Sequence, residues 1–216
     1  MKDYYHTELE AYRGSVEGYS LFALTMLRNS FDAFSALDRE RACEIALGKE
    51  YLSIKADQLE ELGLQFIALH QPVASDLRTI SCCMNLITSA ERIGRYGKDI
   101  CHCTYKLPDT PHIEGMMGLD RMAKLTISML EDVLTAFQRQ DLSIIRGFSE
   151  RDDQVDRMRY LIYEDCISVM ENDPKYIPIC ATYLLVDRYL ERCADHACKT
   201  AEKVHYMVTG ERVDIR

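Results

Sequence analysis

Residues 182–208 of this chain read TYLLVDRYLERCADHACKTAEKVHYMV, and their apolar side chains recur with the spacing of one helix face. Within this stretch, Glu191 and Asp195 stand four residues apart. Residues with that spacing lie one above the other on a helix, so both carboxylates project from the same side. The stretch therefore predicts a long amphipathic helix that presents two carboxylates together.

A second helical pattern that also carries two carboxylates four residues apart lies upstream. Residues 149–170 read SERDDQVDRMRYLIYEDCISVM and carry Asp152 and Asp156, again four residues apart. Between the two patterns, the sequence Asn172-Asp173-Pro174 interrupts the helical periodicity. The two segments are therefore expected to form a helical hairpin that reverses near the proline.

The two carboxylate pairs are equally distant from this reversal. The midpoint of positions 152 and 195 is 173.5, and so is the midpoint of positions 156 and 191. In two antiparallel helices of equal rise, each carboxylate of one pair lies level with a carboxylate of the other. Four converging carboxylates favour a bound cation, and oxygen ligands suit iron, manganese, magnesium, calcium or zinc. The alternative is a solvated charged face in which Glu191 pairs with a neighbouring arginine.

The composition favours a helical protein that does not bind nucleic acid. The 216 residues are 47% apolar and include only 5 prolines and 10 glycines. The net charge of −9 opposes contact with phosphate backbones. The N-terminal residues lack an apolar signal-like stretch, and none of the apolar runs is as long as a membrane span. Nine cysteines without a C-x-x-C pair indicate free thiols in a reducing compartment, so we expect a cytoplasmic protein.

Six helical segments can be delimited, three on each side of a linker with two prolines. Asp38 and Asp141 are expected to cap the second and fifth helices, and Gly210 is expected to end the sixth. The expected helices cover residues 7–36, 39–69, 75–103, 115–139, 142–171 and 175–209. The fold class is thus all-α, with two tandem three-helix bundles. The first covers residues 1–105, a linker covers 106–112, the second covers 113–210, and a frayed polar tail covers 211–216.

The two halves of the sequence resemble each other, which indicates an internal duplication. Met26-Leu27 and Ala33-Phe34 recur 103 residues later, and Glu91-Arg92 recurs 100 residues later. At these offsets the four carboxylate positions of the second half correspond to Lys49, Ser53, Glu91 and Arg95. Arg95 stands one turn from Glu91, where its guanidinium can pair with that carboxylate. We therefore expect the second half alone to bind metal.

The alternative class of protein is a metal-dependent, all-helical hydrolase or oxidase that uses the same carboxylates. A ferritin-like di-iron site would need Glu-x-x-His on two helices, and only Glu202 and His205 have this spacing. His196 follows Asp195 directly and points about 100° away from the carboxylate face. No phosphate-binding loop, nucleophile motif or Cys/His catalytic signature is present in the sequence. We therefore expect no catalytic residues and no enzyme.

Several stretches resemble the PhoU family of phosphate-uptake regulators, and they cover nearly the whole chain in order. These stretches are QPVASDLR (71–78), AERIG (90–94), YLERCADH (189–196) and VTGE (208–211). The resemblance implies two three-helix bundles with Glu/Asp-x-x-x-Asp motifs that bind a metal ion or a multinuclear cluster, iron or zinc among them. In this sequence the motifs fall on Asp152, Asp156, Glu191 and Asp195. In the first half only Glu91 fits the motif.

The same resemblance implies a negative regulator of phosphate uptake and phosphate signalling. Members of the family associate with the ABC phosphate transporter at the membrane and, in bacteria, with the sensor kinase of the phosphate response. For this chain it implies a cytoplasmic protein that reaches the membrane only through protein contacts. It also implies a homodimer, which the Tyr, Leu and Met content of the helices supports.

Overall fold

The computed structural model describes residues 2–215, apart from the side chains of residues 2–4 and 117. Its α-helices are α1 (Lys2–Ser35), α2 (Arg39–Ala46), α3 (Gly48–His70), α4 (Ala74–Lys106), α5 (Leu119–Arg139), α6 (Phe148–Asn172) and α7 (Ile177–Thr209). Three 3-10 turns connect them, namely η1 (Glu114–Gly118), η2 (Leu142–Ile145) and η3 (Pro174–Tyr176). Residues 2–215 contain no strand, which confirms the all-α fold class. Among the helices described, none is long and apolar enough to cross a membrane.

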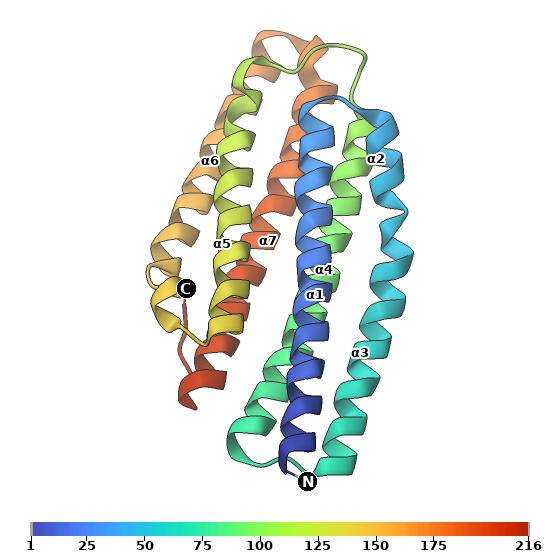
Figure 1. Ribbon diagram of the computed structural model, residues 1–216. Coiled ribbons are helices and arrows are strands. Elements are labelled where there is room, and N and C mark those ends of the chain that lie inside the picture. Colours follow the sequence, from blue (N-terminus) through green and yellow to red (C-terminus); the bar gives the residue numbers. More distant parts are fainter. Residues whose placement is uncertain (1, 216) are drawn as a thin grey trace.

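The helices form two bundles that lie side by side (Figure 1). Helices α1, α3 and α4 make the first bundle, in which α2 precedes α3, and α5, α6 and α7 make the second. The inner helices α4 and α7 pack against each other and run in opposite directions. One continuous apolar core extends through both bundles and includes residues from α4 and α7. The predicted pair of three-helix bundles is confirmed.

The second expected helix, over residues 39–69, is wrong as a single element, because it divides at Leu47 into α2 and α3. Gly48, which follows the break, has a weak preference for the helical conformation. Its Cα faces α1, where an added Cβ would lie 3.4 Å from the Phe22 ring and from the Met26 sulfur. An added Cβ would thus be in ordinary van der Waals contact, so the weak helix preference of Gly48, rather than the space beside α1, favours the break.

The expected caps are present, but one of them starts a different element. Asp38 accepts a hydrogen bond of 2.9 Å from the backbone N–H of Arg41 and caps α2, as expected. Asp141 instead caps the 3-10 turn η2. Gly147, with φ +75°, then separates that turn from α6, so the fifth expected helix begins at Phe148 rather than near residue 142. Gly210, with φ +79°, ends α7 as expected.

The QPVASDLR stretch forms the reversal between α3 and α4. Gln71 ends α3 in the left-handed conformation, and Asp76 in the first turn of α4 accepts a hydrogen bond from the Tyr5 hydroxyl. Arg78 reaches across to the other bundle, where its Nε donates to the Met207 carbonyl at 3.5 Å. A cation at the C-terminal end of a helix offsets the helix dipole, so Arg78 ties the first bundle to the end of α7.

A buried tyrosine holds the linker between the bundles. The Tyr183 hydroxyl, on α7, accepts a hydrogen bond from the backbone N–H of Ile113 at 3.1 Å and lies 2.7 Å from His112 Nδ1. The other ring nitrogen of His112 lies 2.9 Å from the Phe34 carbonyl at the end of α1. The linker, α1 and α7 are therefore joined through one polar network inside an apolar region.

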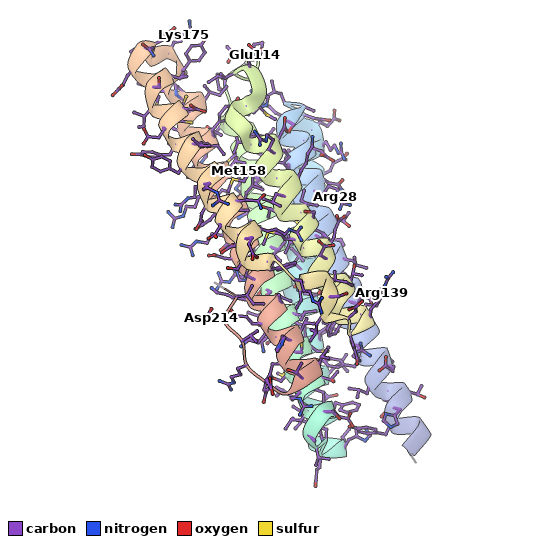
Figure 2. All side chains as sticks on the ribbon, turned by 90° about the vertical axis from the view of Figure 1, so that its left-hand side faces the viewer. Arg28, Glu114, Arg139, Met158, Lys175 and Asp214 are labelled. Carbon is purple, nitrogen blue, oxygen red and sulfur yellow. The ribbon has the colours of Figure 1, made fainter. Side chains whose placement is uncertain are left out.

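The C-terminal tail, which was expected to fray, makes polar contacts with α7 in the described residues. The backbone N–H of Ile215 donates to Glu202 at 3.2 Å, and the ring of His205 lies 3.1 Å from the Glu211 carbonyl. In Figure 2 the segment around Asp214 turns back toward α6. Hydrogen bonds connect this segment to α7. The spacing of apolar residues, from which the helices were predicted, gives no information about such bonds.

Equivalent positions in the two bundles are packed with the same total number of side-chain carbons. Gly94 of α4 faces Leu52 of α3, and a Cβ added at Gly94 would overlap Leu52 Cδ1. At the offsets of the duplication, the second bundle has Ala194 and Val155 at these positions. Moving one methylene between the partners thus preserves the packing volume.

We predict that Gly94→Ala lowers the free energy of unfolding by about 1–2 kcal/mol, because overpacking outweighs the better helix propensity of alanine. Leu52→Val alone should cost about 1 kcal/mol through the lost methylene group. The double variant should be close to the original chain, because it reproduces the pair found in the second bundle. Urea denaturation followed by circular dichroism measures all three. Additive losses in the double variant would contradict the packing argument.

Candidate metal centre on α6 and α7

The first bundle provides a reference for the carboxylate positions. Ser53 Oγ donates a hydrogen bond of 3.2 Å to Glu91 Oε1, which confirms that these residues lie level across the α3–α4 hairpin. Arg95 Nη2 lies 2.5 Å from the same oxygen, so the predicted pairing of Arg95 with Glu91 is confirmed. A side-chain cation thus neutralises the carboxylate on this side.

In the second bundle, arginines also reach the predicted carboxylates. Arg159 Nη1, from α6, lies 3.4 Å from Glu191 Oε1. Arg192 lies 3.6 Å from Glu191 Oε2 and 3.3 Å from Asp195 Oδ2. The arginine pairing that the sequence left open for Glu191 is therefore present.

The structure does not gather the four predicted ligands into one site. Asp152 forms a side-chain hydrogen bond with Cys198, and Asp195 acts electrostatically on the same thiol and also contacts Arg192. Asp156 is exposed and lines an open pocket of about 500 Å³ between α6 and α7. Within residues 2–215, no group of three or more His, Cys, Asp or Glu side chains is arranged to hold a metal ion.

The chemistry of the predicted residues nevertheless fits a hard cation. All four donors are carboxylates, which iron and zinc accept as ligands. Glu191 Oε2 is buried and has no hydrogen-bond partner, and its contact with Arg192 is longer than a hydrogen bond. A buried carboxylate oxygen without a partner is costly, so this atom is suited to receive a cation.

A further carboxylate, which the sequence analysis missed, lies in the same pocket. Asp187 of α7 is only 3% exposed, and its Oδ1 has no hydrogen-bond partner. Its nearest cation is Arg159, whose Nε lies 3.7 Å from Asp187 Oδ2. Two signals in the sequence could have identified it. Asp187 stands four residues before Glu191 on the same helix face, and its equivalent in the first half is the buried Ile87.

The surroundings of Asp187 oppose its charge. Burial raises the pKa of the Asp187 carboxyl to about 7, the Arg159 guanidinium partly counteracts this effect, and the Glu191 carboxylate adds to it. A carboxylate at an apolar core position is rarely explained by folding alone. Perturbed carboxylates in a pocket often mark functional sites.

The imidazole and the two thiols that neighbour Asp195 along α7 do not resemble catalytic groups. Burial lowers the pKa of His196 to about 4, with Lys199 as the next contribution, and its Nδ1 is buried without a partner. Burial also raises the pKa of the thiols of Cys193 and Cys198. A neutral imidazole of low basicity and protonated thiols are poor candidates for a base or a nucleophile near neutral pH.

Comparison with known proteins matches both bundles to one family. The model of the PhoU domain matches residues 17–104 and again residues 119–204. A "Phosphate-specific transport system accessory protein PhoU homolog" of Caulobacter vibrioides is 30% identical over 97% of this chain and 91% of its own length. A homologue of the same name from Streptococcus pneumoniae is 29% identical over the full length of both chains.

Solved structures agree with this match. The phosphate transport system regulatory protein PhoU from Streptococcus pneumoniae superimposes with a TM-score of 0.89 at 28% identity, covering 97% of this chain and 99% of that one. PhoU from Pseudomonas aeruginosa shares the fold, with a TM-score of 0.90 at 24% identity and coverage of 96% and 100%. With both halves matched in order and nearly the full length aligned, this chain belongs to the PhoU family.

Proposed function

We propose that this chain is a negative regulator of phosphate uptake and phosphate signalling that acts through an ABC phosphate transporter. The observation that carries the proposal is the match of both bundles to the PhoU domain. Relatives aligned over nearly the full chain are named accessory proteins of a phosphate-specific transport system. A role accessory to phosphate transport is the common element of these names, and it supports a regulatory role.

In this proposal the chain is cytoplasmic and reaches the membrane through protein partners. None of its described helices could span a bilayer, and its net charge of −9 opposes direct attachment to anionic lipid. The transporter is the first partner, and a sensor kinase of the phosphate response is the second. Enzymatic activity is not part of the proposal, because relatives are named for an accessory role.

We also propose that Asp152, Asp156, Glu191 and Asp195 hold a metal ion or cluster, with iron and zinc as the candidates. Two observations support this: the buried Glu191 oxygen that accepts no hydrogen bond, and the restriction to carboxylate donors. A bound metal would supply concentrated positive charge between α6 and α7. Arg159 and Arg192 would have to release Glu191 and Asp195, and both guanidinium groups are near enough to water to do so, at 46% exposure.

For the homodimer, we propose an interface on the outer face of α1 and α3. Phe22 and Tyr51 meet there with ring centroids 4.7 Å apart, although they remain 37% and 49% exposed. Ile54 lies on the same side of α3 as Tyr51, and Leu47, the residue before α3, continues that side; they are 52% and 75% exposed. A contiguous exposed patch of large apolar side chains is typical of a protein interface.

The regulatory proposal predicts association and a change in uptake. An affinity-tagged copy expressed in its own cell should co-purify with the transporter from detergent-solubilised membranes. Deleting the gene should raise uptake of labelled phosphate in phosphate-rich medium, because the negative regulator is lost. Supplying the intact gene on a plasmid should reverse the increase. Unchanged uptake together with absence of the transporter from the purified material would contradict the proposal.

The metal proposal predicts unequal halves. Asp156→Ala with Asp195→Ala should remove nearly all bound metal, because two of the four carboxylates are lost. Glu91→Ala should leave the metal content almost unchanged, because the Arg95 cation already occupies that side. Elemental analysis of the purified variants gives the metal per chain, and circular dichroism controls for folding. Equal losses in both proteins would rule out the asymmetry.

Asp187→Leu should raise the free energy of unfolding by about 1–3 kcal/mol at pH 8, because it replaces a buried, poorly paired carboxylate with an apolar side chain of the same branching. Asp153→Leu is the control, since Asp153 is exposed and its replacement should change stability by less than about 0.5 kcal/mol. Chemical denaturation measures both. A loss of stability in Asp187→Leu would show that the carboxylate supports the fold.

The dimer proposal predicts that Ile54→Asp produces a monomer, because it places a charge in the centre of the apolar patch. Leu64→Asp is the matched control, since Leu64 is 53% exposed against 52% for Ile54 but lies on another side of α3. Light scattering at micromolar concentration gives the mass of each protein. A monomeric starting protein, or a monomer in both variants, would count against this interface.

A further inference from the structure

Two pockets lie end to end where α1 of the first bundle and α5 of the second run side by side (Figure 1). The first pocket has a volume of about 640 Å³ and the second about 440 Å³. Arg28 and Glu131 line both pockets and form an ion pair across the two helices. The pockets are therefore two parts of one groove, which we name the α1–α5 groove. Its larger apolar lining residues are Leu21, Leu24, Phe31, Ile127 and Leu134.

The two pockets are counterparts in the internal duplication. At the offset of 103, Leu24 corresponds to Ile127 and Phe31 corresponds to Leu134. Each of these equivalent pairs contributes one side chain to each pocket. Because α1 and α5 run in opposite directions, the duplication relates one end of the groove to the other. A partner that lies along the groove therefore meets a similar apolar depression twice.

An acid stands at each end of the groove. Glu17 lines the second pocket and Asp120 lines the first, and these two positions are also equivalent at the offset of 103. Asp32 is a further carboxylate in the first pocket. In the part of the chain that the structure describes, none of these three carboxylates forms an ion pair.

The cations of the groove are too few to balance its acids. Arg28 is already paired with Glu131, and Lys124 is the other cation found among the described lining residues. The lining thus includes four carboxylates and two cations, which gives a net charge of −2. Arg13, near the end of the second pocket, is already paired with Glu10 at 2.8 Å. The groove therefore favours a basic occupant.

Two features leave the groove ready for an occupant. Arg28 and Glu131 are 42% and 49% exposed, and an ion pair so exposed contributes little to stability, so a partner can displace it. In the first pocket, the Ser35 hydroxyl is buried and has no hydrogen-bond partner. The hydroxyls of Ser20 and Ser30 on the same helix instead donate to the carbonyl four residues earlier. A hydrogen bond with an occupant would satisfy the Ser35 hydroxyl.

We propose that the α1–α5 groove docks a basic amphipathic helix of a partner protein. Glu17 and Ser35 lie at the two ends of its α1 side and are 18 residues apart, so the groove is roughly 27 Å long. A helix of about 18 residues has this length. Its apolar face can enter both pockets while basic side chains near its ends meet Glu17 and Asp120. The carboxylates oppose nucleic acid and anionic lipid as occupants. The proposal does not depend on the phosphate-regulating role.

The test of the charge contacts uses the full chain and a fluorescent 20-residue helical peptide, with leucines along one face and lysines in its first and last turns. Fluorescence anisotropy measures binding. Glu17→Lys with Asp120→Lys should weaken binding at least about tenfold, because two attractive contacts become repulsive. The control pair, Glu44→Lys with Glu164→Lys, changes the net charge equally at exposed glutamates outside the groove and should lose less than about twofold. Circular dichroism should show both proteins folded.

The apolar contact is tested with the same peptide. Leu21→Ser should weaken binding at least about threefold, because Leu21 lines the second pocket and its 45% exposed surface would be covered by the peptide. Leu161→Ser is the matched control, since Leu161 is 59% exposed on α6 and does not line the groove. The control should change the affinity less than about twofold.

Three outcomes would overturn the proposal. The first is equal loss of affinity in the two double variants, or failure of the unaltered chain to bind the peptide. The second is equal binding of a peptide of the same composition whose leucines are scattered around the helix, which would indicate charge attraction alone. The third is a lower mass in light scattering for Leu21→Ser but not for Leu161→Ser, which would indicate that this face joins two copies of the chain.

Discussion

The packing of α4 against α7 is the contact on which the architecture depends. A three-helix bundle covers one apolar side of each of its helices, and both inner helices are more than thirty residues long. Each inner helix therefore has a second apolar side that its own bundle cannot shield completely from water. The packing of α4 against α7 shields this side of both helices. The continuous core and the polar network around Tyr183 follow from this contact, because they join elements of both halves.

Much of this arrangement could be predicted because it depends on regular features of the sequence. Apolar spacing located the long helices, and Pro72 and Pro174 located the reversals between them. Distance along the chain from a reversal then gave the register, which the contact between Ser53 and Glu91 confirms in the first half. Helices have a constant rise, so counting residues is enough to align two of them across a short turn.

The parts that could not be predicted depend on side chains that reach between elements. The spacing of Glu191 and Asp195 predicted that they share one helix face. It did not predict that Arg159 of α6 would extend across and contact Glu191. Long guanidinium side chains adopt many conformations, and tertiary contacts select one.

In the two duplicated hairpins, arginines neutralise the equivalent carboxylates Glu91 and Glu191. The two hairpins differ in how easily a bound cation could replace those arginines. Glu91 receives Arg95 from its own helix at 2.5 Å together with the Ser53 hydroxyl, so its ion pair needs no contact with a third helix. Glu191 receives two half-exposed arginines at more than 3.3 Å and keeps one buried oxygen without a hydrogen bond. Asp187, beside it, is almost fully buried with a single distant cation. Electrostatic attraction falls with distance, so the second hairpin holds its counter-charges more weakly than the first. The bundle with the greater carboxylate charge is therefore the one whose charge can be rebalanced by a bound cation.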